Sequence, residues 1–142
     1  MLHSQRGSIY RTILAGFIAL AFCFALVWPQ WTKHRNAKQL QEAADLGRAL
    51  AFAEESYNQA NAAYTPQFNR LNLSLPCPMA VQGGTPFLDC PYYTYQLEEG
   101  RRIKAAHKQF GVWVEVDIPA GTVICRHEPD DWAGQDLCQR MQ

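Results

Sequence analysis

The first 38 residues of this chain contain no aspartate or glutamate, although they carry five basic residues. The rest of the 142-residue chain has 8 basic and 13 acidic residues, so charges of +5 and −5 cancel to a formal net charge of zero. A neutral total therefore conceals a cationic N-terminal end and an acidic remainder. The acidic part has no basic stripe with interleaved aromatic residues, which argues against nucleic acid as a partner.

The chain also lacks the short motifs that carry common catalytic chemistry. It has no Cys-x-x-Cys pair, no glycine-rich loop for a phosphate and no serine elbow. We therefore expect neither an enzyme activity nor a cofactor. Asp130, Asp131 and Asp136 are the candidates for a calcium site, because calcium prefers several oxygen ligands in a flexible loop. Their spacing does not match an EF-hand, and a solvated acidic loop is the favoured interpretation.

What the N-terminal end does contain is an unbroken apolar run from Ile13 to Trp28, closed by Pro29. A cleaved secretory signal is disfavoured, because the end of the run has no small-x-small cleavage site. A lipoprotein signal is disfavoured too, because a phenylalanine precedes Cys23. We expect Cys23 to pack as a small hydrophobic residue. The apolar run is therefore predicted to remain in the mature protein.

The stretch from Ser8 to Trp28 is long enough to cross a bilayer as a helix, at about 1.5 Å per residue. Trp28 and Trp31 then fall where an interfacial aromatic belt is expected. The basic residues after the span outnumber those before it, so the positive-inside rule alone would place the remainder in the cytoplasm. The cysteines argue for the opposite orientation, and we give them more weight.

Four of the five cysteines lie beyond the apolar run, and both sequential pairs have a separation of 13: Cys77 with Cys90, and Cys125 with Cys138. Each such bridge would be worth about 3 kcal/mol in the entropic model. A small domain needs that help, and an oxidising compartment permits it. Four reduced thiols in a cytoplasmic domain are the alternative, and the connectivity itself stays open.

An amphipathic helix is predicted from Thr32 to about Asn61, where the chain has no proline and one glycine, Gly47. Joined to the apolar run it forms one long helix, which Pro29 is expected to kink or locally loosen. Its apolar residues recur every three or four positions and predict a stripe that packs on a sheet. The stripe comprises Ala43, Leu46, Leu50, Ala53, Tyr57, Ala60 and Tyr64.

Beyond residue 66 the pattern changes from helical periodicity to loops and strands. Prolines and glycines between Pro76 and Pro86 predict an irregular connection. Four segments with strand character follow and form an antiparallel meander: 93–97, 103–107, 112–118 and 122–127. The tail from Glu128 to Gln142 is predicted to be irregular, with Cys138 closing it. The fold class is therefore α+β, a long N-terminal helix packed on a small antiparallel meander with a disulfide-closed C-terminal loop.

Arg6 and Gly7 end a short basic leader, the apolar helix follows at once, and Pro29 lies 22 residues past that glycine. The helix is rich in alanine and glutamate and ends in Tyr64-Thr65-Pro66. This plan resembles a type IV pilin or a type II secretion pseudopilin. The resemblance divides the chain into a leader (1–7), a transmembrane and assembly helix (8–30), its amphipathic continuation (31–64) and an extracytoplasmic β head (65–142).

The resemblance implies cleavage between Gly7 and Ser8 by a prepilin peptidase, followed by methylation of the new N-terminus. It also implies residence in the bacterial inner membrane as a single-pass protein, and packing with other pilin or pseudopilin subunits into a pilus or pseudopilus. The membrane and assembly residues would be Ile13, Phe17, Phe24, Trp28 and Pro29.

Two residues depart from the family pattern. Ser8 stands where the mature chain normally begins with phenylalanine, and Thr12 stands at the fifth mature position, where the family has glutamate. In a filament that carboxylate neutralises the free amine of a neighbouring subunit, and an unpaired charge in hydrocarbon is costly. A minor subunit is therefore expected. The alternative is a membrane-anchored periplasmic binding or interaction module that does not polymerise.

Overall fold

The computed structural model describes residues 3–141, with side chains from Ile9 onward. The chain divides into two compact units, one up to Asn36 and one from Ala37. Helix α1, His3–Asn61, contributes to both units. The second unit also contains a short 3-10 helix, η1 (Phe68–Arg70), six strands and a final helix.

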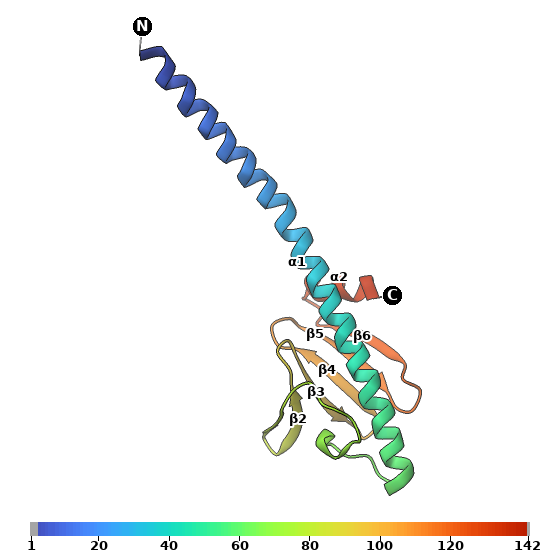
Figure 1. Cartoon of the computed structure of the whole chain (residues 1–142). Helices are drawn as coiled ribbons and strands as arrows, with labels where there is room; N and C mark the ends of the chain where they lie inside the picture. The colour runs from blue at the N-terminus through green and yellow to red at the C-terminus, as the bar shows by residue number, and fades with distance from the viewer. Residues whose placement is uncertain (1–2, 142) are drawn as a thin grey trace. The chain divides into compact units, whose positions relative to one another are not determined.

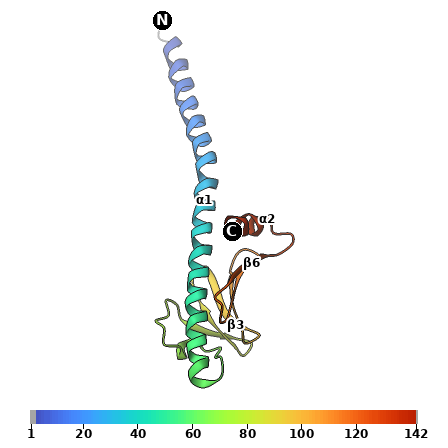
Figure 2. The ribbon, with the colours of Figure 1, turned by 90° about the vertical axis from the view of Figure 1, so that its right-hand side faces the viewer.

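The strands form one antiparallel sheet in which every strand pairs with the next along the chain, in the order β1 to β6. They are β1 (Met79–Gln82), β2 (Thr85–Asp89), β3 (Tyr93–Glu98), β4 (Arg102–His107), β5 (Val112–Asp117) and β6 (Val123–His127). The part of α1 from Ala37 onward, cyan to green in Figure 1, lies along one face of this sheet, as Figure 2 also shows. The predicted α+β fold is confirmed.

Alternation along the strands decides which face packs against α1. The residues of β3, β4 and β5 that point toward the helix are buried, because successive strand residues point to opposite faces. On this inner face lie Tyr93, Tyr95, Ile103, Ala105, Val112, Val114 and Val116. The four predicted strands correspond to β3 through β6, within one residue at each end.

The predicted helix stripe is right in part. Ala43 and Leu50 are fully buried on the sheet, whereas Ala60 is exposed. The buried face is rotated slightly from the predicted one, and it includes positions that the prediction left out. The additional residues are Leu40, Ala44, Gly47, Ala51 and Glu54.

At Gly47, α1 lies so near the sheet that an added side chain would collide with it. A Cβ atom added at Gly47 would lie 2.8 Å from Cγ2 of Val116 on β5. Real Cβ atoms do not approach that closely, so the helix and strand can pack at this depth because position 47 has no side chain.

The segment from Pro76 to Pro86 was predicted to be irregular, and that prediction is wrong. It contains β1 and the start of β2, joined by Gly83 and Gly84, which have φ angles of +59° and +84°. Two consecutive residues with positive φ make the tight turn that suits a two-residue hairpin, and glycine adopts them without strain.

The tail from Glu128 was also predicted to be irregular, but it contains helix α2, Trp132–Met141. Asp131 caps this helix, because its Oδ1 accepts the backbone N–H groups of Ala133 and Gly134, each at 3.1 Å. Leu137 and Cys138 are buried on its inner side. The disulfide-closed segment is therefore a short capped helix.

Candidate assembly and membrane segment

The part of α1 that precedes Ala37 has an apolar surface without partners in its own unit. The described side chains from Ile9 to Trp31 are all exposed, and the large apolar ones are between about half and three-quarters accessible. Exposed apolar patches of this size are rare on soluble monomers and mark contact with a membrane or another protein. The predicted assembly residues all belong to this surface: Ile13, Phe17, Phe24, Trp28 and Pro29.

Helix α1 is also long and apolar enough to cross a membrane, judged over its described part from Ile9. Its exposed apolar side chains lie on all sides of the helix, with no polar face before Gln30 other than the early Arg11 and Thr12. A helix that is apolar all round belongs in lipid or inside a bundle of helices.

The C-terminal end of the apolar segment is a ladder of aromatic rings that ends in a cation. The rings of Phe24 and Trp28 are 6.3 Å apart, and those of Trp28 and Trp31 are 6.1 Å apart. The guanidinium of Arg35 lies 5.1 Å from the centre of the Trp31 ring. Tryptophan followed by a long basic side chain is typical of a membrane–water interface, where indole and cation both contact headgroups.

Pro29 does not interrupt the helix, since the residues on both sides of it remain helical. The hydroxyl of Thr32 donates to the carbonyl oxygens of Trp28, at 3.1 Å, and of Pro29, at 3.0 Å. Thr32 thus adds hydrogen bonds in the turn that follows the proline, where local loosening was predicted.

The two predicted processing residues, Gly7 and Ser8, lie within the helical span of α1, but the structure describes side chains only from Ile9 onward. Cleavage between Gly7 and Ser8 therefore stays a prediction from the sequence.

Both predicted disulfides are present. Cys77 and Cys90 have a Cα–Cα distance of 5.1 Å, and Cys125 and Cys138 one of 5.4 Å. The first bridge joins Cys77, two residues before β1, to Cys90, the residue after β2, and the second fastens α2 to β6. Cys23 is free and exposed, like the apolar residues around it, and its packing as a small hydrophobic residue stays a prediction.

The acidic residues proposed for calcium are engaged in local contacts. Asp131 caps α2, and Asp136 Oδ2 lies 3.2 Å from Nε of Arg140. Asp130 is exposed beside them. The residues that the structure describes contain no cluster of three or more histidine, cysteine or acidic side chains fit to hold a metal ion.

Sequence reasoning missed a buried carboxyl group on α1. Glu54 is fully buried, and its Oε2 accepts the backbone N–H of Thr65 at 3.0 Å, while Oε1 is buried without a hydrogen-bond partner. Burial raises the pKa of Glu54, and the hydrogen bond from Thr65 only partly opposes this. The carboxyl group thus fastens the chain after α1 back onto the helix. The sequence signal that could have located Glu54 on the buried face of α1 is its helical spacing from Gly47 and Ala51.

The sheet face that points away from α1 carries a polar network centred on Glu115. Its Oε1 accepts the indole N–H of Trp113 at 2.9 Å, and its Oε2 lies 3.0 Å from Nε of Arg126 and 3.9 Å from Nη1 of Arg102. Burial alone would raise the pKa of Glu115, but the two hydrogen bonds and the two guanidinium charges outweigh it and lower the pKa.

We compared the chain with family models, with curated proteins and with solved structures, and none of the three comparisons gives a match. Any assignment of function therefore depends on the residues themselves.

Proposed function

We propose that this chain is a minor pilin or pseudopilin, a structural subunit of a type IV pilus or a type II secretion system. It resides in the bacterial inner membrane by the N-terminal part of α1, and it assembles with other subunits through that helix. The unit from Ala37 lies outside the cytoplasm and determines which neighbours the subunit contacts. Its role is structural, and it does not turn over a substrate.

The observation that carries the proposal is the exposed apolar surface from Ile9 to Trp31, on the same helix whose continuation is buried against a sheet. Such a segment needs a covering that its own unit does not supply. In the membrane the covering is lipid, and in a filament it is the helices of neighbouring subunits. A helix can accept either covering because its backbone N–H and C=O groups are hydrogen-bonded within the helix, which is the condition for crossing hydrocarbon.

The aromatic ladder and the disulfides support the orientation. Trp28, Trp31 and Arg35 fit the interface at the outer end of the span. The two bridges, Cys77–Cys90 and Cys125–Cys138, fit an oxidising compartment beyond it.

Thr12 supports a minor position. A shaft subunit has a neighbour whose N-terminal amine needs a carboxylate, whereas a subunit at the tip has no such neighbour above it. A threonine at position 12 is tolerable at the tip and costly in the shaft, because the unpaired amine would remain charged in hydrocarbon.

Peptide mapping of the protein isolated from its native membrane tests the processing step. The expected result is a mature chain that begins at Ser8 with a methylated amine. An intact Met1 on the membrane-bound protein would refute processing and leave the anchored module as the better hypothesis.

Co-sedimentation with filaments sheared from cells distinguishes a filament subunit from an anchored module that does not polymerise. The subunit should co-sediment with pili or with an overproduced pseudopilus, and Thr12→Glu should raise its occupancy along the filament. Thr32→Glu is the matched control, because it adds the same charge beyond the span and should not raise occupancy. A wild-type chain found in membranes and never in filaments would favour the second candidate, an anchored periplasmic interaction module.

A further inference from the structure

Strands β2 and β3 separate from one another after a short stretch of pairing. They pair at two positions, Leu88 with Tyr95 and Asp89 with Thr94. By contrast, β3 pairs with β4 at six positions, from Tyr93 with His107 to Glu98 with Arg102. Residues 96–98, at the end of β3, are therefore paired with β4 on one side but have no paired residue in β2 on the other.

A proline explains where the pairing stops. The N–H of Cys90 donates to the carbonyl of Tyr93 at 3.0 Å, so the backbone groups of Tyr93 point toward β2. In an antiparallel pair these groups alternate, and those of Tyr95 and Leu97 point the same way. The continued register would place Leu97 opposite Pro86, which has no N–H to donate.

The hairpin of β1 and β2 is held firmly at the opposite end. The Cys77–Cys90 bridge closes its base, and the N–H of Asp89 donates to the carbonyl of Pro78 at 2.9 Å. Its turn, at Gly83 and Gly84, is the end that diverges from β3. The opening between the strands thus has a fixed base.

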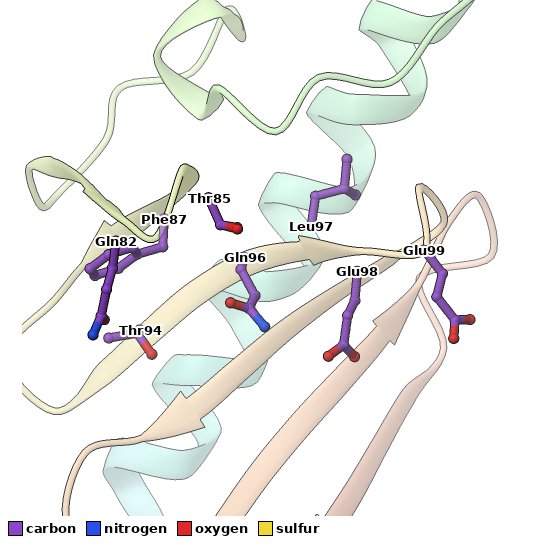
Figure 3. Close-up of a pocket in the computed structure, with 8 residues that line it drawn as sticks. All are labelled: Gln82, Thr85, Phe87, Thr94, Gln96, Leu97, Glu98 and Glu99. Atoms are coloured by element: carbon purple, nitrogen blue, oxygen red, sulfur yellow. The ribbon is translucent and has the colours of Figure 1, made fainter.

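The opening contains a hollow of about 410 Å³. Phe87 from β2 and Gln96 from β3 lie on either side of it, and Glu98 and Glu99 lie toward the end of β3 (Figure 3). Gln96 and Glu98 project to one side of β3 while Leu97 projects to the other. Among the described residues, no lysine or arginine lines the hollow.

We propose that this hollow binds an extended segment of a partner protein, which pairs with β3 through the backbone of Leu97. A lysine or arginine of that segment lies against Glu98 and Glu99. Unpaired strand edges are templates for strand addition, in which main-chain hydrogen bonds supply affinity and the side-chain pockets supply specificity. The proposal goes beyond filament assembly and does not depend on it.

The size and charge of the hollow set the chemistry of the segment. Three open positions, 96–98, cover about 10 Å of strand, so the pairing is short and side chains must contribute. Phe87 offers a flat apolar contact, while Glu98 and Glu99 bring two carboxylates. Nζ of Lys104 lies 3.2 Å from Oε1 of Glu98, so Glu98 already has a cationic partner. The more exposed Glu99 is therefore the principal partner for an incoming cation.

Three synthetic heptapeptides test the proposal on the full chain in detergent micelles, with binding followed by NMR titration. The first is acetyl-Thr-Val-Thr-Lys-Thr-Val-Thr-amide, the second has glutamate in place of the lysine, and the third is the lysine peptide with N-methylated backbone amides. The lysine peptide should bind and should slow hydrogen exchange at the Leu97 amide. The glutamate peptide should bind about fivefold more weakly or worse, and the N-methylated peptide should not bind.

Matched variants locate the site. Glu98→Gln combined with Glu99→Gln should remove the preference for lysine over glutamate, whereas Glu128→Gln, an exposed carboxylate outside the hollow, should keep it. Protection of Val81 in place of Leu97 would put the peptide on the free edge of β1 and overturn the proposal. Equal binding of all three peptides, or no binding of the lysine peptide at millimolar concentration, would overturn it as well. Filament incorporation is measured separately, so failure here leaves the proposed function untouched.

Discussion

The two parts of helix α1 share a backbone and differ in what covers them. Before Asn36 the apolar side chains are exposed on all sides, and from Ala37 the apolar residues form a buried stripe against a sheet. The first part carries no acidic residue, whereas the second carries Glu42, Asp45, Glu54 and Glu55. The exposed apolar side chains of the first part therefore indicate a surface that lipid or another protein covers. The exposed polar side chains of the second part indicate contact with water.

Replacing one leucine in each part gives the largest contrast. Leu50→Ala leaves a cavity at a fully buried site and should lower the free energy of unfolding of the unit from Ala37 by about 2–5 kcal/mol. Leu20→Ala removes a side chain that is 62% exposed and should leave that free energy unchanged. Urea unfolding in detergent, followed by circular dichroism, measures both. Equal losses would contradict the separation into two units.

An arginine placed at one of two similarly exposed phenylalanines tests whether lipid or water surrounds that part of α1. Phe17 is 69% exposed and Phe52 is 59% exposed. Phe17→Arg should cost about 2.5–3.5 kcal/mol in membrane insertion, because the cation would lie within the span. Phe52→Arg should have little effect, because the cation would remain in water. The readout is the fraction of protein retained in membranes after alkaline extraction; equal retention of the two variants would refute the span.

Gly16 in the first part of α1 and Gly47 in the second part extend the comparison to smaller changes. Gly47→Ala gains up to about 1 kcal/mol of helix propensity but introduces a Cβ 2.8 Å from Val116, and overpacking typically costs about 1–3 kcal/mol. The net result should be a loss of about 1 kcal/mol. Apart from its chain neighbours and the nearby backbone of its own helix, no atom of the described residues lies within 4 Å of a Cβ added at Gly16, so Gly16→Ala should not destabilise the protein. Thermal unfolding of the two variants checks the difference, and a stabilising Gly47→Ala would contradict the close packing.

The smallest effect is a pH dependence that comes from Glu54. Its pKa is raised in the folded protein, so the folded state holds a proton that the unfolded state releases, and stability falls as the pH rises from about 4.5 through the raised pKa. Glu54→Gln should flatten this part of the profile while keeping an acceptor for Thr65. Glu42→Gln, at an exposed site, is the control.

Glu115 contributes with the opposite sign, since its pKa is lowered in the folded state and its stabilisation is lost as the pH falls through that lowered pKa. Urea unfolding at a series of pH values distinguishes the two carboxyl groups. An unchanged slope above pH 4.5 in Glu54→Gln would mean that another group titrates there.

The sequence predicted the elements whose pattern repeats. Alternation from Tyr93 to His127 located β3 through β6, and helical spacing located the second part of α1. The equal cysteine separations favoured the two bridges that form, while leaving the connectivity open. These features are local, so a short window contains the signal.

The missed features depend on tertiary context. Pro78, Gly83 and Pro86 look like loop residues, yet a hairpin at the edge of a sheet tolerates prolines and requires residues with positive φ. Helix α2 has ten residues and is held by Cys138, too short for periodicity to reveal. Glu54 was left out of the buried stripe because it is charged, and only the packed structure shows that the N–H of Thr65 reaches it.

The order of the strands has a consequence for how this unit forms. Each of the strands β2 to β6 pairs with the strand just before it in the sequence, so each new hairpin adds to an existing edge. Pairing between sequence neighbours closes short loops and is fast. The long-range step is the docking of the sheet on the second part of α1. If the first part is anchored in a membrane as proposed, the start of that helix is fixed before any strand has emerged. We therefore expect the unit to mature from its anchored end outward, with β6 and α2 as the final pieces.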